Sequence, residues 1–432
     1  MKLIPTASCL SFSENARVPL HFLLLLALTP GSRASGDGDL SITLPRQHLS
    51  PAELGLIIND LDPLSRHIGA YYAERRQIPE ANQIHIRLAP EPVIKAEAFA
   101  EVYRQVQQQT PEQVQAYALT WAEPYRVDCM SITTGFAVGY DPAFCADECN
   151  LTRPSPYFAT NSQAPYDDYR WRPTMALAGE SFDEVKALID RGIAADETRP
   201  AGTGYLVSTD DAARNVRARQ YQRVIGSFGS IVRLEQVEAN AIRYRPDVLF
   251  YFTGLVRVPD IDTNTYLPGA IADHVTSSGG VLTGSRQMSA LRWLEAGATA
   301  SYGAVVEPCN FPAKFPSPAV LIANYLNGAT AIEAYWKSVA MPGQGIFIGE
   351  PLARPYGGYA LEYQAGEDDA EGDHWRLTTY ALSPGRYRLE SALDPLGPYE
   401  GRGTFVKKGA APAVLELPVE GAPVYRILPA SP

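Results

Sequence analysis

Short apolar runs alternate with helical segments along most of this chain, and this alternation is the feature that most limits its fold. The run at 54–59 (LGLIIN) is typical of a buried strand, and residues 63–77 carry apolar side chains at helical spacing. The pattern continues with a predicted strand at 83–88, a helix at 96–109 and a strand at 115–121. Strands that alternate with helices predict a mostly parallel sheet covered on both faces, so we expect a three-layer α/β domain.

The alternation is broken between 128 and 180 and changes character near residue 358. Helices are predicted at 182–193, 211–224, 287–295, 319–326 and 331–339, and strands at 204–208, 248–252, 298–306 and 345–348. Segment 128–180 is rich in Cys, Pro, Tyr, Asn and Asp without a strong period, which predicts a long insertion tied by its cysteines. Short strands separated by turns predict a small antiparallel β module at 358–432, after an α/β domain at 50–357.

The N-terminus has the pattern of an export signal. Arg17 precedes an apolar run at 18–28, and small or turn-forming residues follow from Pro30 to Gly36. A run of this length suits a signal peptide and is too short to span a bilayer. We therefore expect residues 1–36 to be a signal peptide, and the mature chain to reach the periplasm or the extracellular space without spanning a membrane.

Charge and known motifs restrict the function classes. The formal net charge is −11, which argues against a nucleic-acid-binding protein, because such proteins usually present a basic face. The sequence contains neither a Walker phosphate-binding loop nor a His-Glu-x-x-His zinc motif. No cofactor and no metal are expected from these patterns.

Four cysteines belong to the expected mature chain: Cys129, Cys145, Cys149 and Cys309. An even number in an oxidising compartment predicts disulfides, and four cysteines allow three pairings. Cys145 and Cys149 are close enough in sequence to pair locally. The alternative is a structural metalloprotein with a four-thiolate zinc site. The C-x3-C spacing is looser than in most zinc knuckles and occurs once, so disulfides are favoured.

Several long motifs resemble a known family. They are TWAEPYRV (120–127), CMSITTGFAVG (129–139), LPGAIADHVTSSGG (267–280), EAGATASYGAVVEPCNFPAKFP (295–316) and GEPLARPY (349–356). Together they resemble a family of uncharacterised exported bacterial proteins, found in genomes that encode exosortase, a membrane enzyme that processes tagged envelope proteins. The resemblance covers about residues 50–357. It implies an envelope context and an exosortase-processed envelope protein as a partner, and it implies no reaction.

A more distant resemblance suggests a mechanism to test. The order of strand VLFYFTG, loop LPGAIADHVTSSGG, strand GATASYG and turn GEPL looks like the gingipain-type branch of the caspase-like fold. In that branch a His-Gly pair follows one strand and a catalytic Cys follows the next. Here Thr253-Gly254 stands at the first place, and Ser277 or Ser278 at the second. Because the Cys–His pair is absent, the resemblance implies a degenerate peptidase that binds a peptide or a glycan.

The alternative is an active serine-type hydrolase. His274 lies in the predicted loop DHVTSSGG, where it would act as general base for Ser277 or Ser278, with Asp273 or Glu307 as the residue that orients it. The same side chains would equally serve to satisfy loop backbone groups.

Polar residues that follow predicted strands define the expected binding cleft. Because the carboxyl ends of parallel strands form the ligand site of an open sheet, we expect these residues to gather at one rim. They are Thr253, Glu307, Asn310, Lys314, Glu350 and Arg354. A structural ion-pair network is the alternative role for the charged members.

Overall fold

The computed structural model describes residues 40–146, 149–366, 373–419 and 423–430. The predicted signal peptide at 1–36 lies outside these residues. Within the described ranges, no helix combines the length and the apolar character needed to cross a bilayer.

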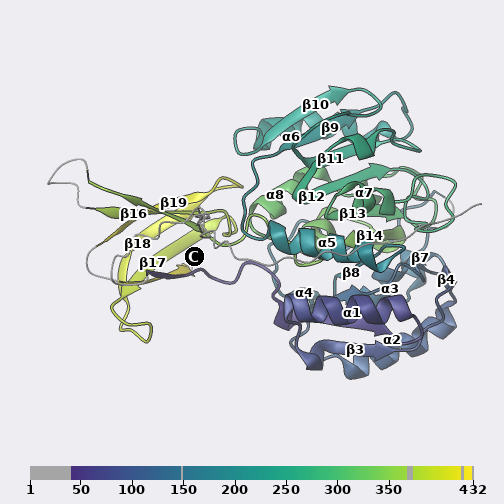
Figure 1. The fold of residues 1–432 in the computed structure, drawn as a ribbon, viewed down its shortest axis with the longest axis horizontal. Helices are drawn as coiled ribbons and strands as arrows, with labels where there is room; N and C mark the ends of the chain where they lie inside the picture. Colours follow the sequence, from purple (N-terminus) through teal and green to yellow (C-terminus); the bar gives the residue numbers. More distant parts are fainter. Residues whose placement is uncertain (1–39, 147–148, 367–372, 420–422, 431–432) are drawn as a thin grey trace, which may run out of the picture. The chain divides into compact units, whose positions relative to one another are not determined.

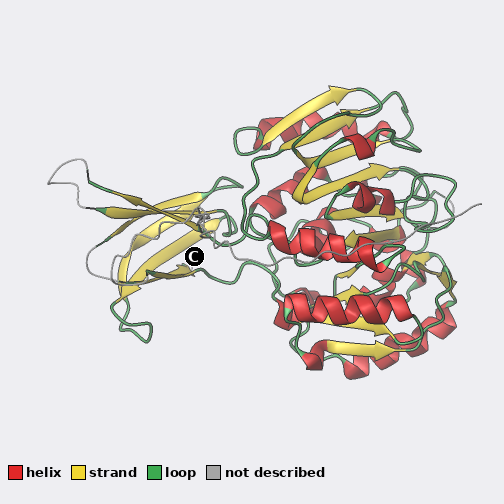
Figure 2. Cartoon of the chain, in the orientation of Figure 1, coloured by secondary structure: helices red, strands yellow, loops and turns green. Residues whose placement is uncertain are grey.

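A ten-stranded sheet forms the centre of the α/β domain (Figures 1 and 2). Its strands, in spatial order, are β10 (Arg233–Glu238), β9 (Thr203–Ser208), β11 (Val248–Gly254), β12 (Tyr266–Val275), β13 (Ala300–Ala304), β14 (Gly345–Gly349), β8 (Thr174–Ala176), β5 (Ala116–Leu119), β2 (Leu54–Asn59) and β3 (Gln83–Ile86). The sheet has two parallel blocks, β10 to β13 and β8 to β3 in this order. Between them lies β14, which pairs with β13 in the antiparallel sense. The expected mostly parallel sheet is confirmed.

Helices cover both faces of this sheet, and nearly all of its strands are therefore buried on both sides. Ile58, Phe252 and Phe347 point into one apolar cluster, together with residues of α1, α6, α8 and α9. Their neighbours, among them Ile57 and Ile348, point into a cluster with residues of α2, α3 and α7. The helices are α1 (Pro63–Arg76), α2 (Ala96–Gln109), α3 (Ile132–Val138), α4 (Pro165–Tyr169), α5 (Phe182–Ala195), α6 (Tyr221–Phe228), α7 (Leu291–Ala296), α8 (Pro318–Leu326) and α9 (Ala331–Ser338).

The C-terminal segment forms the expected small antiparallel β module from two sheets. One sheet has the order β1-β20-β17-β18 and the other β15-β16-β19. Their strands are β1 (Ser41–Thr43), β15 (Ala360–Gln364), β16 (His374–Thr379), β17 (Gly385–Ala392), β18 (Glu400–Lys407), β19 (Ala413–Pro418) and β20 (Val424–Pro429). The parallel pairing of β1 with β20 was not predicted, and it adds residues from before the α/β domain to this module.

Segment 128–180 differs from the long irregular insertion that its composition predicts. It contains α3, whose side chains are almost all buried, and β8, which lies in the sheet between β14 and β5. A short sheet of β4 (Val93–Ile94), β6 (Arg126–Val127) and β7 (Met130–Ser131) precedes α3. The prediction failed because β8 has only three residues, too few to show a period.

The predicted loop LPGAIADHVTSSGG is also a strand for most of its length. Residues Tyr266–Val275 form β12, so His274 lies in the sheet and not in a loop. The stretch from Gly269 to Val275 is buried on both faces, and its sequence therefore lacks the alternation that marks a half-exposed strand. Pro268 and Gly269, which has a φ of 87°, interrupt the apolar pattern at its start.

Candidate functional site

The carboxyl ends of several strands meet at one edge of the sheet, which we call the carboxyl rim. Thr253 and His274 are paired neighbours near the ends of β11 and β12. Beyond β12 the chain folds onto β13, where the Gly280 amide donates to the Ala304 carbonyl over 2.8 Å. The segment after β5 reaches the same edge, because the Thr283 hydroxyl bonds the Glu123 carboxylate. The carboxyl rim therefore contains the ends of β5, β11, β12 and β13.

The turn GEPLARPY lies at the opposite edge, so the prediction of a single common rim is wrong for Glu350 and Arg354. Because β14 is antiparallel to β13, its last residue pairs with Ala300 at the start of β13. The Glu350 amide donates to the Thr299 carbonyl over 3.0 Å. The buried Glu350 carboxylate accepts hydrogen bonds from Arg76, over 2.7 and 3.0 Å. At this edge, Glu350 is therefore occupied by its ion pair with Arg76 and by its backbone hydrogen bond to Thr299.

His274 has a buried environment that does not suit a general base. Its side chain is 1% exposed, and Nδ1 accepts a hydrogen bond of 2.9 Å from the Trp293 indole. Burial is the main cause that lowers the pKa of His274 to about 3, and the nearby Arg217 charge adds to it. Ser277 and Ser278 are half-buried beyond the end of β12. Among the described residues, no hydrogen bond joins His274 to either serine.

Asp273 points to the other face of the sheet, because successive side chains of a strand alternate. There it forms an ion pair with Arg217, with 2.5 Å between Oδ1 and Nη1, and both side chains are at most 2% exposed. Burial raises the pKa of Asp273, and Arg217 acts in the opposite direction. Arg217 also donates to the carbonyl of Thr253 over 2.7 Å and to that of Pro316 over 3.2 Å. Asp273 therefore has a structural role as the partner of Arg217 on the other face of the sheet, and it does not orient His274.

Thr253 is buried at 1% exposure, and its hydroxyl has no hydrogen-bond partner among the described residues. It shares a face of the sheet with His274, since paired residues of parallel strands point the same way. Its side chain is therefore closed off from solvent, whereas the sequence pattern predicts a ligand contact at this position.

The loop after β13 brings the remaining predicted residues to the carboxyl rim. Glu307 is exposed, and its Oε1 accepts a hydrogen bond of 2.8 Å from the Cys309 amide. Asn310 is half-buried. Lys314 turns inward: it is 1% exposed and donates from Nζ to the Asn150 carbonyl over 2.8 Å. Burial lowers the pKa of Lys314. Glu307 is thus the charged residue of this loop that faces solvent.

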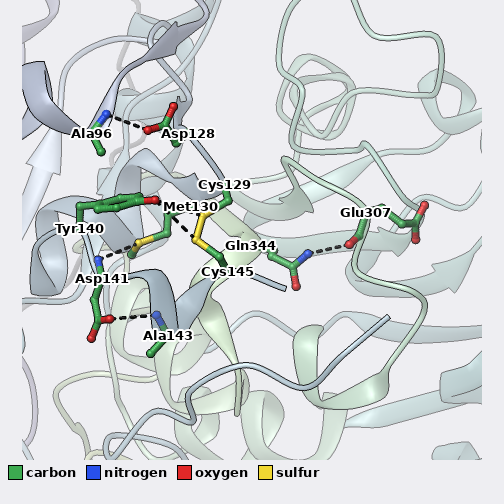
Figure 3. Close-up of a disulfide and its surroundings, with 10 residues drawn as sticks. All are labelled: Ala96, Asp128, Cys129, Met130, Tyr140, Asp141, Ala143, Cys145, Glu307 and Gln344. Carbon is green, nitrogen blue, oxygen red and sulfur yellow. Dashed lines mark hydrogen bonds between the residues drawn. A yellow bond between two sulfur atoms is a disulfide. The ribbon is translucent and has the colours of Figure 1, made fainter. Parts of the chain in front are cut away.

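The four cysteines form two disulfides, which confirms the disulfide prediction. The pairs are Cys129–Cys145 and Cys149–Cys309, each with a Cα–Cα distance of 5.4 Å. The local Cys145–Cys149 pairing considered from the sequence is not formed. Figure 3 shows the first disulfide beside Tyr140, whose hydroxyl lies 3.8 and 3.9 Å from the two sulfurs. Because all four sulfurs are oxidised, no thiolate is left for the zinc site of the metalloprotein alternative.

A polar network at the carboxyl rim was missed from the sequence. The Arg214 guanidinium pairs with Asp211 over 2.9 Å and donates from Nε to the Thr276 hydroxyl over 3.2 Å. Thr276 in turn donates to the Gln287 side chain over 2.7 Å, which also accepts from the Ser278 amide. These residues come from loops after β9 and β12 that no sequence period connects. Acidic residues directly after the predicted strand at 204–208 were the available signal.

A cavity of about 310 Å³ lies between α5 and α7. Ala178, Leu291 and Leu294 give it apolar walls, and Glu184 and Arg191 contribute charged groups. Arg191 donates to the carbonyl of Leu294 in α7 over 3.0 Å and to that of Ala298, just beyond α7, over 2.8 Å, and burial lowers its pKa to about 10. This cavity could not be foreseen from the sequence, because lining residues such as Arg191 and Leu294 lie 103 positions apart in the chain.

Comparison with known protein families gives no match for this chain, and no curated protein matches it. A solved structure described as "Structure of Protease" aligns with 86% of this chain and 98% of its own length, at 9% identity and a TM-score of 0.33. A likeness at this level establishes neither a shared fold nor a shared activity.

Proposed function

We propose that this chain is an exported envelope protein with a degenerate, caspase-like peptidase domain that binds its ligand at the carboxyl rim without cleaving it. The order of motifs that resembles the gingipain-type branch supports the domain type. Two disulfides support a place in an oxidising compartment, because such bonds are rare in cytosolic proteins.

One observation carries the non-catalytic part of the proposal: Asp273 and His274 lie on opposite faces of the sheet, each about 1% exposed. A general base has to reach the proton that it removes, within about 3 Å or through one water. His274 instead accepts a hydrogen bond from Trp293 and has no bond to Ser277 or Ser278 among the described residues.

The polar groups of the rim favour a ligand rich in hydrogen-bonding groups. Gln287, Arg214 and Asp211 offer an amide, a guanidinium and a carboxylate. Asp211 bonds Arg214 directly, and the Thr276 hydroxyl links Arg214 to Gln287. Exposed Glu307 adds a negative charge. Peptides and glycans both match this set of groups. The cavity between α5 and α7 favours a peptide, because its lining combines Leu291 and Leu294, which suit an aliphatic side chain, with charged groups such as Arg191.

Two measurements test the proposal. The first is labelling of the purified protein with a fluorophosphonate, which reacts with activated serines. We expect no labelling. Labelling that disappears in Ser277→Ala or Ser278→Ala would instead establish the hydrolase alternative.

The second measurement is ligand retention. The immobilised protein is incubated with a pool of four- to eight-residue peptides and, separately, with chito-oligosaccharides, and bound compounds are identified by mass spectrometry. We expect peptides to be retained, and retention to fall at least about 10-fold in Glu307→Lys at the carboxyl rim. The matched control is Glu80→Lys, an exposed acidic residue before β3 at the opposite edge. Equal losses in the two variants would refute binding at the carboxyl rim.

A further inference from the structure

The loop after β13 has an unusual backbone at the point where a disulfide holds it. Cys309 and Asn310 have φ values of 58° and 53°, which lie in the left-handed region. Among the described residues they are the one pair of consecutive non-glycine residues with positive φ. Side chains with a Cβ are disfavoured in this region, and such residues persist only where the surroundings hold them.

This loop is held at its start, in its interior and at its end. In the interior, residues Pro312–Lys314 form a 3-10 helix, and the Met341 backbone amide donates to the Ala313 carbonyl over 2.8 Å. At the start, the Gln344 side chain donates from Nε2 to the Glu307 carbonyl over 2.6 Å. At the end, the Tyr302 hydroxyl donates to the Lys314 carbonyl over 2.5 Å, and Lys314 is buried. Between these anchors, the Cys149–Cys309 bond ties residues 308–313 to a segment 160 residues earlier in the chain.

The two disulfides differ in their access to solvent. Cys149 is exposed and Cys309 is half-buried. Cys129 and Cys145 are both half-buried, and the Tyr140 hydroxyl lies against both of their sulfurs (Figure 3). Because thiol–disulfide exchange requires direct attack on a sulfur, a reductant reaches the Cys149–Cys309 bond more easily.

We propose that the Cys149–Cys309 disulfide is a reducible clamp. It holds the loop at 308–313 at the carboxyl rim, with Cys309 and Asn310 in the left-handed region, and releases this loop on reduction while the fold persists. The reductant is a dithiol. One of its thiolates attacks Sγ of Cys149, the Sγ–Sγ bond breaks, and Cys309 leaves as a thiolate. The second thiol of the reductant then displaces Cys149. The dithiol ends as a cyclic disulfide, and the protein gains two electrons and two protons as two thiols.

Release allows the backbone of Cys309 and Asn310 to leave the left-handed region. It also loosens the hydrogen bond from the Cys309 backbone amide to the Glu307 carboxylate. An effect of this release on ligand binding rests on the proposed function. The release itself does not, since it is a change in the loop alone, and it is measured without any ligand.

The test uses the full chain with dithiothreitol under native conditions. Samples are alkylated with N-ethylmaleimide over time and peptide-mapped to give the reduction rate of each disulfide. In parallel, hydrogen exchange is followed for peptides that cover 308–313 and for peptides of β11 and β13. We expect Cys149–Cys309 to be reduced at least about 10-fold faster than Cys129–Cys145. Exchange at 308–313 should rise about 10-fold or more, while β11 and β13 stay protected.

Two variants separate the clamp from general loosening. Cys149→Ser should show fast exchange at 308–313 without reductant, whereas the paired change of Cys129→Ser and Cys145→Ser should leave this loop protected. Two results would overturn the proposal. One is reduction of both disulfides at the same rate with loss of protection in β11 and β13. The other is reduction of Cys149–Cys309 with unchanged exchange at 308–313. The wild-type measurement decides the matter even where a variant fails to fold.

Discussion

Removing Arg217 gives the most direct test of the buried charges beneath the carboxyl rim. Arg217 and Asp273 are at most 2% exposed and pair over 2.5 Å. Breaking a buried ion pair by removing one partner typically costs about 3–5 kcal/mol, because the other charge stays buried without compensation. Arg217→Met also leaves the carbonyls of Thr253 and Pro316 without their donor. We therefore expect a loss in the upper part of that range at pH 7.

The same variant has a predicted pH dependence with a definite sign. Burial already raises the pKa of Asp273, and loss of the opposing Arg217 charge raises it further. A carboxyl with a higher pKa in the folded state binds its proton more tightly there than in the unfolded chain. Arg217→Met should therefore be most stable below the unfolded pKa of about 3.9 and lose stability as pH rises through the folded pKa.

Urea unfolding with linear extrapolation gives the free energies. The matched control is Arg219→Met, an exposed arginine two residues further along, which should change stability by less than about 0.5 kcal/mol. The double variant Arg217→Met/Asp273→Leu removes both charges and should recover most of the loss, since apolar replacements of buried pairs are often neutral. A loss below about 1 kcal/mol in Arg217→Met, or a double variant no better than the single one, would refute the reasoning.

Three further predictions concern stability. The pKa of His274 is about 3 in the folded chain, so unfolding should take up a proton as pH falls below 6.5. The free energy of unfolding of the wild type, measured in urea, should therefore fall by about 2 kcal/mol between pH 7 and pH 5, and this pH dependence should be absent in His274→Asn. A Cβ at Gly303 would lie 2.4 Å from the backbone of the loop after β12, so Gly303→Ala should lower the melting temperature strongly. In contrast, Gly226 is an exposed position of α6 where an added Cβ would meet no heavy atom within 4 Å, so Gly226→Ala should gain about 0.5–1 kcal/mol. Joint replacement of Cys129 and Cys145 by serine removes a bond between residues 16 positions apart, and it should lower the free energy of unfolding by up to about 3 kcal/mol, because the unfolded chain gains entropy. An unchanged free energy of unfolding would contradict this explanation.

Elements with a clear local period were predicted almost to the residue. The helix predicted at 96–109 is observed as Ala96–Gln109, because Phe99, Val102 and Val106 mark one buried face. The strand predicted at 54–59 is observed with the same bounds. In these segments the local pattern and the tertiary packing agree, so the sequence is sufficient.

Features that depend on long-range pairing could not be read from the sequence. The reversed direction of β14, which moves Glu350 to the opposite edge, leaves no mark in a five-residue apolar strand. The bond between Cys149 and Cys309 joins segments whose proximity only the folded sheet creates. The sequence analysis missed both features for one reason: strand order and direction are set by packing and not by local composition.

The strand assignment of residues Tyr266–Val275 decides the interpretation of the Asp-His pair. In a loop, neighbouring side chains can converge on one substrate, and the hydrolase hypothesis depends on that freedom. In a strand, Asp273 and His274 must point to opposite faces, and here each face is closed, by Arg217 on one side and by Trp293 on the other. A repacked His274 side chain would still be separated from Asp273 by the sheet itself. Catalysis by this pair would therefore require β12 to leave the sheet, whereas ligand binding at the rim requires no such change.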